Sequence, residues 1–211
     1  MALTNYGTLK TAVADRLSRS NMTSLIPDFI SIAHFKMMRG DYDLGMPALR
    51  MSDMLTTSTL TLSDGAASLP ADYLEAKRIY VDTSETPAIS YIPPEKWYGL
   101  QAQGQAGIPA FYTIEGSTIR CAPYGAYDLK LYYYAALDAL SDDADTNAIF
   151  TKGPHAYLYG ALSEAYDHIR QHDRAQMYAK RFASAVRSLN EDSQQAMQSG
   201  DVLTMRADKV V

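Results

Sequence analysis

The sequence has few of the residues on which many protein functions depend. It contains one cysteine, Cys121, among 211 residues, which excludes an internal disulfide and a cysteine-rich zinc site. No stretch approaches the ~18 consecutive apolar residues that a membrane span needs. Asn5, Lys10 and Asp15 stand where a signal peptide would need an apolar block. We therefore expect neither secretion nor membrane attachment.

Charged residues are also scarce, at 20% of the chain, and they are unevenly distributed. Residues 1–40 carry five basic and two acidic side chains, residues 41–150 carry six and fifteen, and residues 151–211 carry eight and seven. Phosphate contacts need Lys and Arg, so the acidic middle is not expected to bind nucleic acid tightly. It is typical of a solvated surface, or of a surface that nucleic acid passes without being held.

The motifs of common enzymes are missing. Gly99, Gly104 and Gly107 are not followed by Gly-Lys-Ser/Thr, and there is no Gly-x-Ser-x-Gly. His168 and His172 have the spacing of one helical turn, which allows two imidazoles to share a metal, but no Glu stands between them as in a zinc-protease helix. An exposed polar helix face is the favoured interpretation. We expect no catalytic residue, no cofactor and no metal, and a small metal-dependent hydrolase remains an alternative.

Apolar residues recur at helical spacing near both ends of the chain. They predict helices at about residues 4–19, 23–39, 154–169 and 173–195, with Asn5 or Thr4 as the first cap and Gly40 as a stop. The expected buried positions are Leu9, Ala12, Val13, Leu17, Ile26, Phe29, Ile30, Ala33, Met37, Tyr157, Leu158, Ala161, Leu162, Ala165, Tyr166, Ile169, Met177, Phe182, Ala185, Val186 and Leu189.

Between these helices the hydrophobic period changes to that of strands. Thr, Tyr, Gly and Pro become frequent, and strands are predicted at about 55–62, 76–81, 88–92, 111–114, 118–121 and 129–135, with a tight turn at residues 115–117. We expect an α+β fold in which helices from both ends form one bundle, residues 1–45 and 141–198. A small antiparallel β domain, residues 46–140, is inserted, and residues 199–211 form a tail.

Tyrosine is the unusually abundant residue, with sixteen copies against five Phe. Tyrosine suits interfaces because its ring offers a large contact area and its hydroxyl tolerates water. Tyr132 and Tyr134 share one face of a predicted strand and are candidate contacts to another subunit or a partner, although simple sheet packing also explains them. The tail supplies further candidate contacts at Val202, Leu203, Met205, Val210 and Val211.

Three segments together resemble a known family. They are Leu25-Ile-Pro-Asp-Phe-Ile30, Leu69-Pro-Ala-Asp-Tyr73, and the run from Pro154 to Ala165 followed by an amphipathic helix. In this order and spacing they resemble the head-to-tail adaptor (connector) proteins of short-tailed bacteriophages, among which is tail tubular protein A. The resemblance covers most of residues 4–195.

The resemblance implies a virion protein of the neck or tail that assembles in the host cytoplasm. The implied partners are the portal protein, a tail nozzle or tail tube protein, and further copies of the chain in the twelve-membered ring of that family. Genomic DNA would pass through without sequence-specific binding. Another neck component, such as a minor tail or tail-completion protein, is the alternative within the same class.

Overall fold

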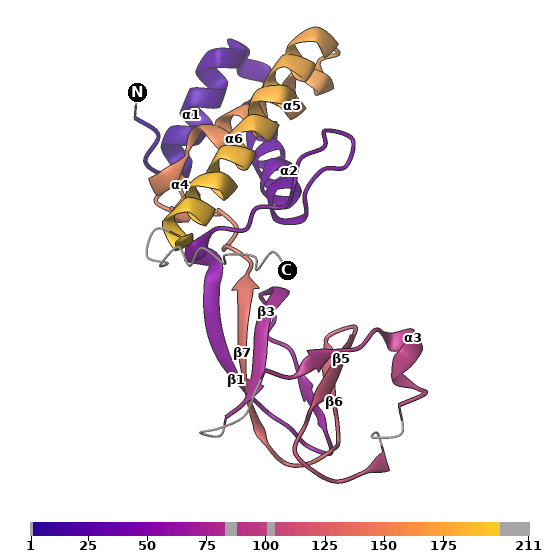
Figure 1. The fold of residues 1–211 in the computed structure, drawn as a ribbon. Helices are drawn as coiled ribbons and strands as arrows, with labels where there is room; N and C mark the ends of the chain where they lie inside the picture. Colours follow the sequence, from indigo (N-terminus) through magenta and orange to yellow (C-terminus); the bar gives the residue numbers. More distant parts are fainter. Residues whose placement is uncertain (1, 83–87, 101–103, 199–211) are drawn as a thin grey trace, which may run out of the picture. The chain divides into compact units, whose positions relative to one another are not determined.

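The computed structural model describes residues 2–82, 88–100 and 104–198. The chain divides into two compact units, of which one is Met1–Ser52 with Leu137–Val211 and the other is Asp53–Ala136. The first is helical and the second is made mainly of strands (Figure 1). The expected α+β class with a β insertion is confirmed. Residues 46–52, which we expected in the β insert, cluster with the helices instead.

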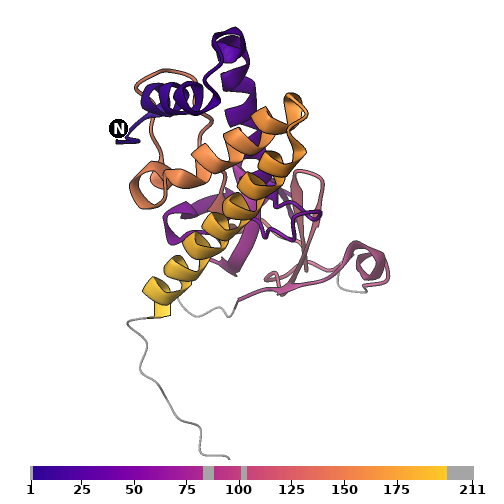
Figure 2. The same cartoon turned by 90° about the horizontal axis from the view of Figure 1, so that it is seen from above.

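Helices from both ends of the chain build the helical unit. It contains α1 (Tyr6–Leu17), α2 (Ile26–Arg39), α4 (Ala148–Lys152), α5 (His155–His168) and α6 (His172–Gln198). Helix α5 contacts α1, α2 and α6, and Figure 2 shows α6 running alongside α5. Nineteen of the twenty-one positions predicted to be buried lie in the core. The prediction is wrong for Met177, which is 40% exposed, and for Ile169, which caps the end of α5 and is only partly buried. The start of the second helix differs from the prediction, because Ser20–Leu25 forms a 3-10 helix before α2 begins.

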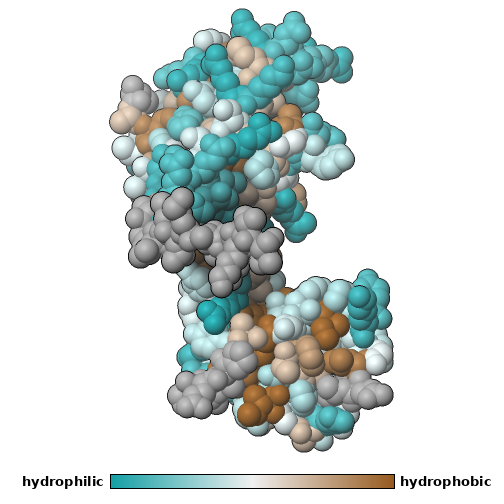
Figure 3. Space-filling view, viewed as in Figure 1, coloured by the Kyte–Doolittle hydropathy of each residue, from teal (hydrophilic) through white to brown (hydrophobic). Residues whose placement is uncertain are grey.

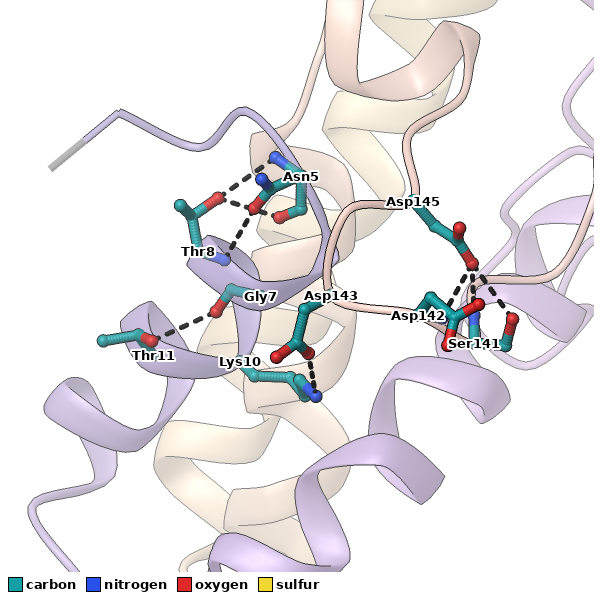
Figure 4. Close-up of polar contacts among 9 residues, drawn as sticks. All are labelled: Asn5, Gly7, Thr8, Lys10, Thr11, Ser141, Asp142, Asp143 and Asp145. Carbon is teal, nitrogen blue, oxygen red and sulfur yellow. Dashed lines mark hydrogen bonds and ion pairs between the residues drawn. The ribbon is translucent and has the colours of Figure 1, made fainter.

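The acidic segment before α4 closes the N-terminal end of α1 (Figure 4). Asn5 caps the helix by accepting a hydrogen bond from the Thr8 amide, and Thr8 Oγ1 accepts one from the Asn5 amide. The amides of Tyr6 and Gly7 donate to the carbonyls of Asp145 and Asp143, at 2.9 Å each. The first amides of a helix have no partner within it, so this segment satisfies donors that would otherwise need water.

Close packing of α5 against α2 depends on Gly160. A Cβ at this position would lie 2.7 Å from Ala33 Cβ on α2 and 3.1 Å from the Phe182 ring on α6. Side chains do not approach that closely, so a residue without Cβ is required where the three helices meet. Tyr157, one turn earlier on α5, is completely buried.

Helix α6 holds the extended segment that leads out of the helical unit. Asn190 accepts a hydrogen bond from the Arg50 amide at 2.7 Å and donates to the Ala48 carbonyl at 3.0 Å. The buried Ser193 accepts from the Ser52 amide at 2.6 Å. Leu49 and Met51 are completely buried between these bonds. This is why residues 46–52 belong to the helices, although their composition resembles that of the β segment.

The β unit is a sandwich of two small sheets. One has the order β1 (Leu55–Thr61), β7 (Asp128–Ala135), β3 (Tyr73–Val81), all antiparallel. The other has the order β2 (Ala66–Ser68), β6 (Thr118–Ala122), β5 (Phe111–Glu115), β4 (Ser90–Tyr91). Their shared core contains ten buried residues, Leu60, Leu62, Ile79, Val81, Ile89, Ile119, Cys121, Leu129, Leu131 and Tyr133.

Strand alternation assigns the tyrosines of β7 to different faces. Leu129, Leu131 and Tyr133 point into the core, and the Tyr133 hydroxyl donates to Asp72 at 3.0 Å. Successive residues of a strand face opposite sides, so Tyr132 and Tyr134 lie on the other face with Lys130. We call this the outer face of the β1-β7-β3 sheet.

Two strand predictions need correction. The strand expected at 88–92 is only Ser90–Tyr91, and it pairs in parallel with β5, so the second sheet is mixed and not purely antiparallel. Strand β2 was not predicted, because three residues give too little alternation to recognise. A single helical turn, α3 (Pro94–Trp97), follows β4. The hairpin of β5 and β6 turns at Gly116, which has φ +61°, as predicted.

Replacing Gly160 with Ala should destabilise the helical unit. The new methyl group collides with Ala33, and after the better helix propensity of Ala is subtracted we expect a net loss of about 1–2 kcal/mol in urea unfolding. Gly104→Ala is the control, because its Cβ would meet nothing within 4 Å. The double variant Gly160→Ala, Ala33→Gly should lose less free energy of unfolding than the sum of the losses in the two single variants. Strict additivity would show that the two positions do not touch.

A buried polar network joins α2 to the segment that returns from the β unit. His34 Nδ1 lies 2.8 Å from the Tyr157 hydroxyl, to which Asn147 Nδ2 donates at 2.8 Å. The Tyr157 hydroxyl therefore accepts a hydrogen bond from Asn147 and forms a second one with the His34 ring. Burial lowers the pKa of His34, outweighing a hydrogen bond to the Leu137 backbone that acts in the other direction.

This network should make stability depend on pH. The folded-state pKa of His34 lies below its ordinary value, so its contribution is complete above about pH 6.5 and is lost as the pH falls through the folded-state pKa. We expect the free energy of unfolding to fall more between about pH 7 and about pH 5 in the natural chain than in His34→Gln. His155→Gln, at an exposed position, should keep the natural profile. Identical profiles for His34→Gln and the natural chain would refute this.

Candidate functional site

The two histidines considered for a metal site do not share a helix. Helix α5 ends at His168, and α6 begins at His172 after a turn in which Arg170 has φ +59°. The predicted one-turn spacing is therefore wrong. His172 Nδ1 contacts the exposed Asp167 at 3.2 Å, whereas the ring of His168 packs 5.6 Å from Phe29. Within residues 2–82, 88–100 and 104–198, no group of three or more His, Cys, Asp or Glu side chains could hold a metal ion.

Cys121 is placed and protonated as a packing residue. It lies in β6 within the core of the sandwich, as expected of a cysteine in a strand. Burial raises the pKa of its thiol to about 12. Only the thiolate is a strong nucleophile, so the side chain is chemically inert at neutral pH.

Thiol labelling tests this assignment. We expect a disulfide reagent to react slowly with Cys121 in the folded chain and with one thiol per chain after unfolding in urea, because the thiol is buried and protonated. The control is Cys121→Ser combined with Ser117→Cys, which puts a thiol in the exposed β5–β6 turn and should label quickly. Equally fast labelling of folded Cys121 would contradict the burial.

A charged cluster in the helical unit joins one lysine to two carboxylates. Lys36 on α2 contacts Glu164 on α5 at 2.8 Å and Asp41 at 3.3 Å. Burial opposes the charge on Lys36, but these two carboxylates more than offset it and raise the pKa of the amine. The adjacent hollow, of about 230 Å³, is also lined by Ser163, Asp167 and Ala175 among others. Lys36 is paired with two carboxylates, so the cluster ties α2 to α5 and keeps an excess of negative charge.

The tyrosines predicted as contacts both lie on the outer face of the β1-β7-β3 sheet. Tyr132 is half-buried, whereas Tyr134 is only 6% exposed and has little surface to offer another molecule. The remaining predicted contacts, Val202, Leu203, Met205, Val210 and Val211, lie outside the described residues, as does the whole tail from residue 199.

A second surface of the β unit carries exposed aromatic and aliphatic side chains. These are Tyr91, Tyr98, Ile108 and Tyr124, of which Tyr98 is 74% exposed. The Tyr98 hydroxyl donates to Glu115 at 2.9 Å, and Arg120 donates to the same carboxylate at 2.9 Å. Figure 3 shows hydrophobic residues gathered over this part of the molecule, where β5, β6 and α3 lie. Sequence reasoning missed these exposed residues because they come from several short segments with no periodic pattern.

The helical unit has a smaller exposed apolar surface on α2. Ile32 and Phe35 face solvent, Phe35 at 57% exposure, and the Arg39 guanidinium lies 4.7 Å from the Phe35 ring. Tyr42, in the loop after α2, is 99% exposed. The exposure of Ile32 and Phe35 could have been predicted from the sequence. Both residues lie outside the stripe that was predicted to be buried, which consists of Ile26, Phe29, Ile30, Ala33 and Met37.

Taken together, the described residues of both units offer exposed contact surfaces. Lys36 is paired with two carboxylates, burial lowers the pKa of the partly buried His34, and burial raises the pKa of the Cys121 thiol. No helix within the described ranges is both long and apolar enough to cross a bilayer. Exposed Tyr, Phe and Ile on both units are typical of proteins that bind other proteins.

Comparison with known proteins identifies the class to which these surfaces belong. The chain matches the family model described as SU10 adaptor protein over residues 4–206. It therefore belongs to the SU10 adaptor protein family, a family of phage head-to-tail adaptors. The adaptors of this family are structural proteins and not enzymes. A search of curated proteins gave no match. The resemblance to tail tubular protein A in particular stays a hypothesis.

Proposed function

We propose that this adaptor forms a ring below the portal protein, twelve-membered as the family resemblance implies. The ring would line part of the channel through which genomic DNA passes and offer a platform to a tail nozzle or tail tube protein. The observation that carries the proposal is the family match over residues 4–206. A head-to-tail adaptor works in the virion neck, and its subunits would assemble in the host cytoplasm before they join the particle.

The charge distribution supports a channel function. Residues 41–150 carry six basic and fifteen acidic side chains. DNA must move through a neck in both packaging and ejection, and a surface with few Lys and Arg residues does not retain phosphates. Some of this acidity is used inside the protein, since the Asp145 carboxylate accepts hydrogen bonds from the Ser141 and Asp142 amides. The remaining exposed carboxylates supply the repulsion.

The exposed side chains support several protein contacts per subunit. A ring subunit between portal and tail needs surfaces for its two neighbours and for partners above and below. The surface around Tyr98 and the surface around Phe35 lie on different units of the chain and provide separate contacts. We further propose Tyr132 and Tyr134 on the outer face of the β1-β7-β3 sheet, and Val202, Leu203, Met205, Val210 and Val211 in the tail, as contacts to a neighbouring subunit or the portal.

Imaging of reconstituted complexes tests the function. We expect purified full-length chain, mixed with purified portal rings of the same phage, to form an additional ring on one end of the portal in electron micrographs, because an adaptor binds the portal directly. The chain imaged without portal shows whether the ring needs this partner. Binding to isolated tail proteins with none to portal rings would identify another neck or tail-completion component and overturn the proposal.

A shortened chain ending at Gly200 is the comparison variant in the same experiment. It should melt at the same temperature as the full chain, because the described core ends within α6. It should bind portal rings more weakly if residues 202–211 make assembly contacts. Unchanged portal binding would remove the tail from the contact set and leave the adaptor function itself standing.

A further inference from the structure

Strand β1 lies at the edge of its sheet with one side of its backbone free. It pairs with β7 in an unbroken antiparallel register, from Leu55 opposite Tyr134 to Thr61 opposite Asp128. The Leu62 amide donates to the Tyr127 carbonyl at 2.9 Å, whereas the Asp128 carbonyl accepts from Asp82, beyond β3. In an antiparallel ladder the bonded pairs alternate. The amides and carbonyls of Thr57, Thr59 and Thr61 therefore point away from β7.

No described residue covers these outward groups. The backbone hydrogen bonds of the described chain include none to Thr57, Thr59 or Thr61 from a further strand, and all three residues are exposed. The hydroxyls of Thr59 and Thr61 are engaged on the outer face, where Lys130 donates to Thr59 at 2.7 Å and Thr61 donates to Asp128 at 2.7 Å. These bonds place the side chains beside β7 and leave the edge itself open.

The β1 edge also lacks the devices that keep strands apart. Proteins protect exposed edges with charged residues, Pro, bulges or short strands. The sequence of β1, Leu-Thr-Thr-Ser-Thr-Leu-Thr, has no charge, no Pro and no Gly, and its register has no bulge. The opposite edge, β3, has two register shifts, and Ile89 already donates to its Ile79 carbonyl at 2.9 Å. The open edge of this sheet is therefore suited to accept another strand.

The C-terminal segment of this chain has the composition and length of such a strand. Helix α6 ends at Gln198, and thirteen residues follow it. Residues 202–205 read Val-Leu-Thr-Met, an uncharged run between Asp201 and Arg206. A neutral run matches the neutral edge, because no charge would be buried without a partner. Thirteen extended residues reach about 40 Å, enough to cross a subunit boundary.

We propose that residues 202–205 of one copy add as an extra strand to the β1 edge of the neighbouring copy, opposite Thr57, Thr59 and Thr61. This proposal rests on the proposed ring. The donor segment and the acceptor edge are different parts of the chain, which is the head-to-tail contact that closes rings. Side-chain alternation then places Leu203 and Met205 on one face of the sheet, where they extend the core beside Leu60. Val202 and Thr204 join the outer face with the threonines and Tyr132.

Amide exchange gives a specific test. The probe is a synthetic peptide of residues 199–211, added to the full-length chain labelled for NMR. We expect the peptide to slow exchange at Thr57, Thr59 and Thr61 and to leave Ser58 and Leu60, already bonded to β7, unchanged. This alternation identifies strand addition, because a surface contact would protect neighbouring amides alike. Absence of the alternation overturns the proposal. The proposal is also overturned if the three amides are protected before peptide is added, to the same extent at every protein concentration. In that case the tail of the same chain would occupy the edge.

Proline substitutions test the main-chain contact from both sides. Thr59→Pro removes an outward amide that β7 does not use, and peptide binding should weaken at least about tenfold. Thr59→Val, the matched control, keeps the backbone and should bind as the natural chain does. If Thr59→Pro proves unstable, the peptide carrying Leu203→Pro gives the same test on an unaltered chain, with Leu203→Ile as its control. Equal binding of proline and control forms overturns the proposal.

The outcome is separable from that of the proposed function. Portal binding by the full chain, combined with failure of the peptide to protect the β1 edge, leaves the adaptor function intact and overturns strand addition. Peptide binding to portal rings with none to this chain assigns the tail to the portal and likewise overturns it. Alternating protection in the absence of portal supports strand addition whether or not portal rings are bound.

Discussion

This architecture depends on main-chain hydrogen bonds to the helices. They form at the two places where the chain passes between the helical unit and the β unit. The chain leaves the helical unit after a segment whose amides bond to Asn190 and Ser193 of α6. It returns through a segment whose carbonyls accept from Tyr6 and Gly7 of α1. Both sets of hydrogen bonds use backbone groups that would otherwise lack partners. They fix the positions where the chain leaves and re-enters the helical unit, and no additional hydrophobic core is needed there. The bundle can then be completed by helices that are far apart in sequence.

The sequence predicted the parts of this fold that repeat over many residues. Helical stripes such as Ile26, Phe29, Ile30, Ala33 and Met37 specify their own buried face, and every residue of that stripe is buried. The change of period located the β insertion, because alternation over seven to nine residues is hard to mistake. Asn5 and Gly40 were correctly assigned to helix ends because capping chemistry is local.

What the sequence could not predict depends on long-range contacts or on single backbone angles. The parallel pairing of β4 with β5 involves two residues of β4 and carries no periodic signal. Residues 46–52 join the helices through bonds to Asn190 and Ser193, partners about 140 positions away. The turn with positive φ at Arg170 separates α5 from α6, so the four-residue spacing of His168 and His172 does not place them on one helical face. The exposed aromatic residues around Tyr98 come from separate short segments, and the sequence does not show which of these segments lie close together in the fold. Of the contact residues expected from sequence, Tyr132 keeps exposed surface and Tyr134 does not.

The pairing of β1 with β7 has a consequence for how the insertion affects the helical unit. These strands are the first and last of the insert, and Leu55 lies directly opposite Tyr134. The two ends of the insert are thus held one strand spacing apart by the insert's own sheet. Bringing the ends of a flexible loop together costs entropy, and this cost grows with the length of the loop. In this chain the folded β unit already holds the ends of the insert together. For the helices, the whole β unit acts as a short, stiff connection. Its size and surface can therefore diverge between phages while the helical unit keeps the same closure entropy.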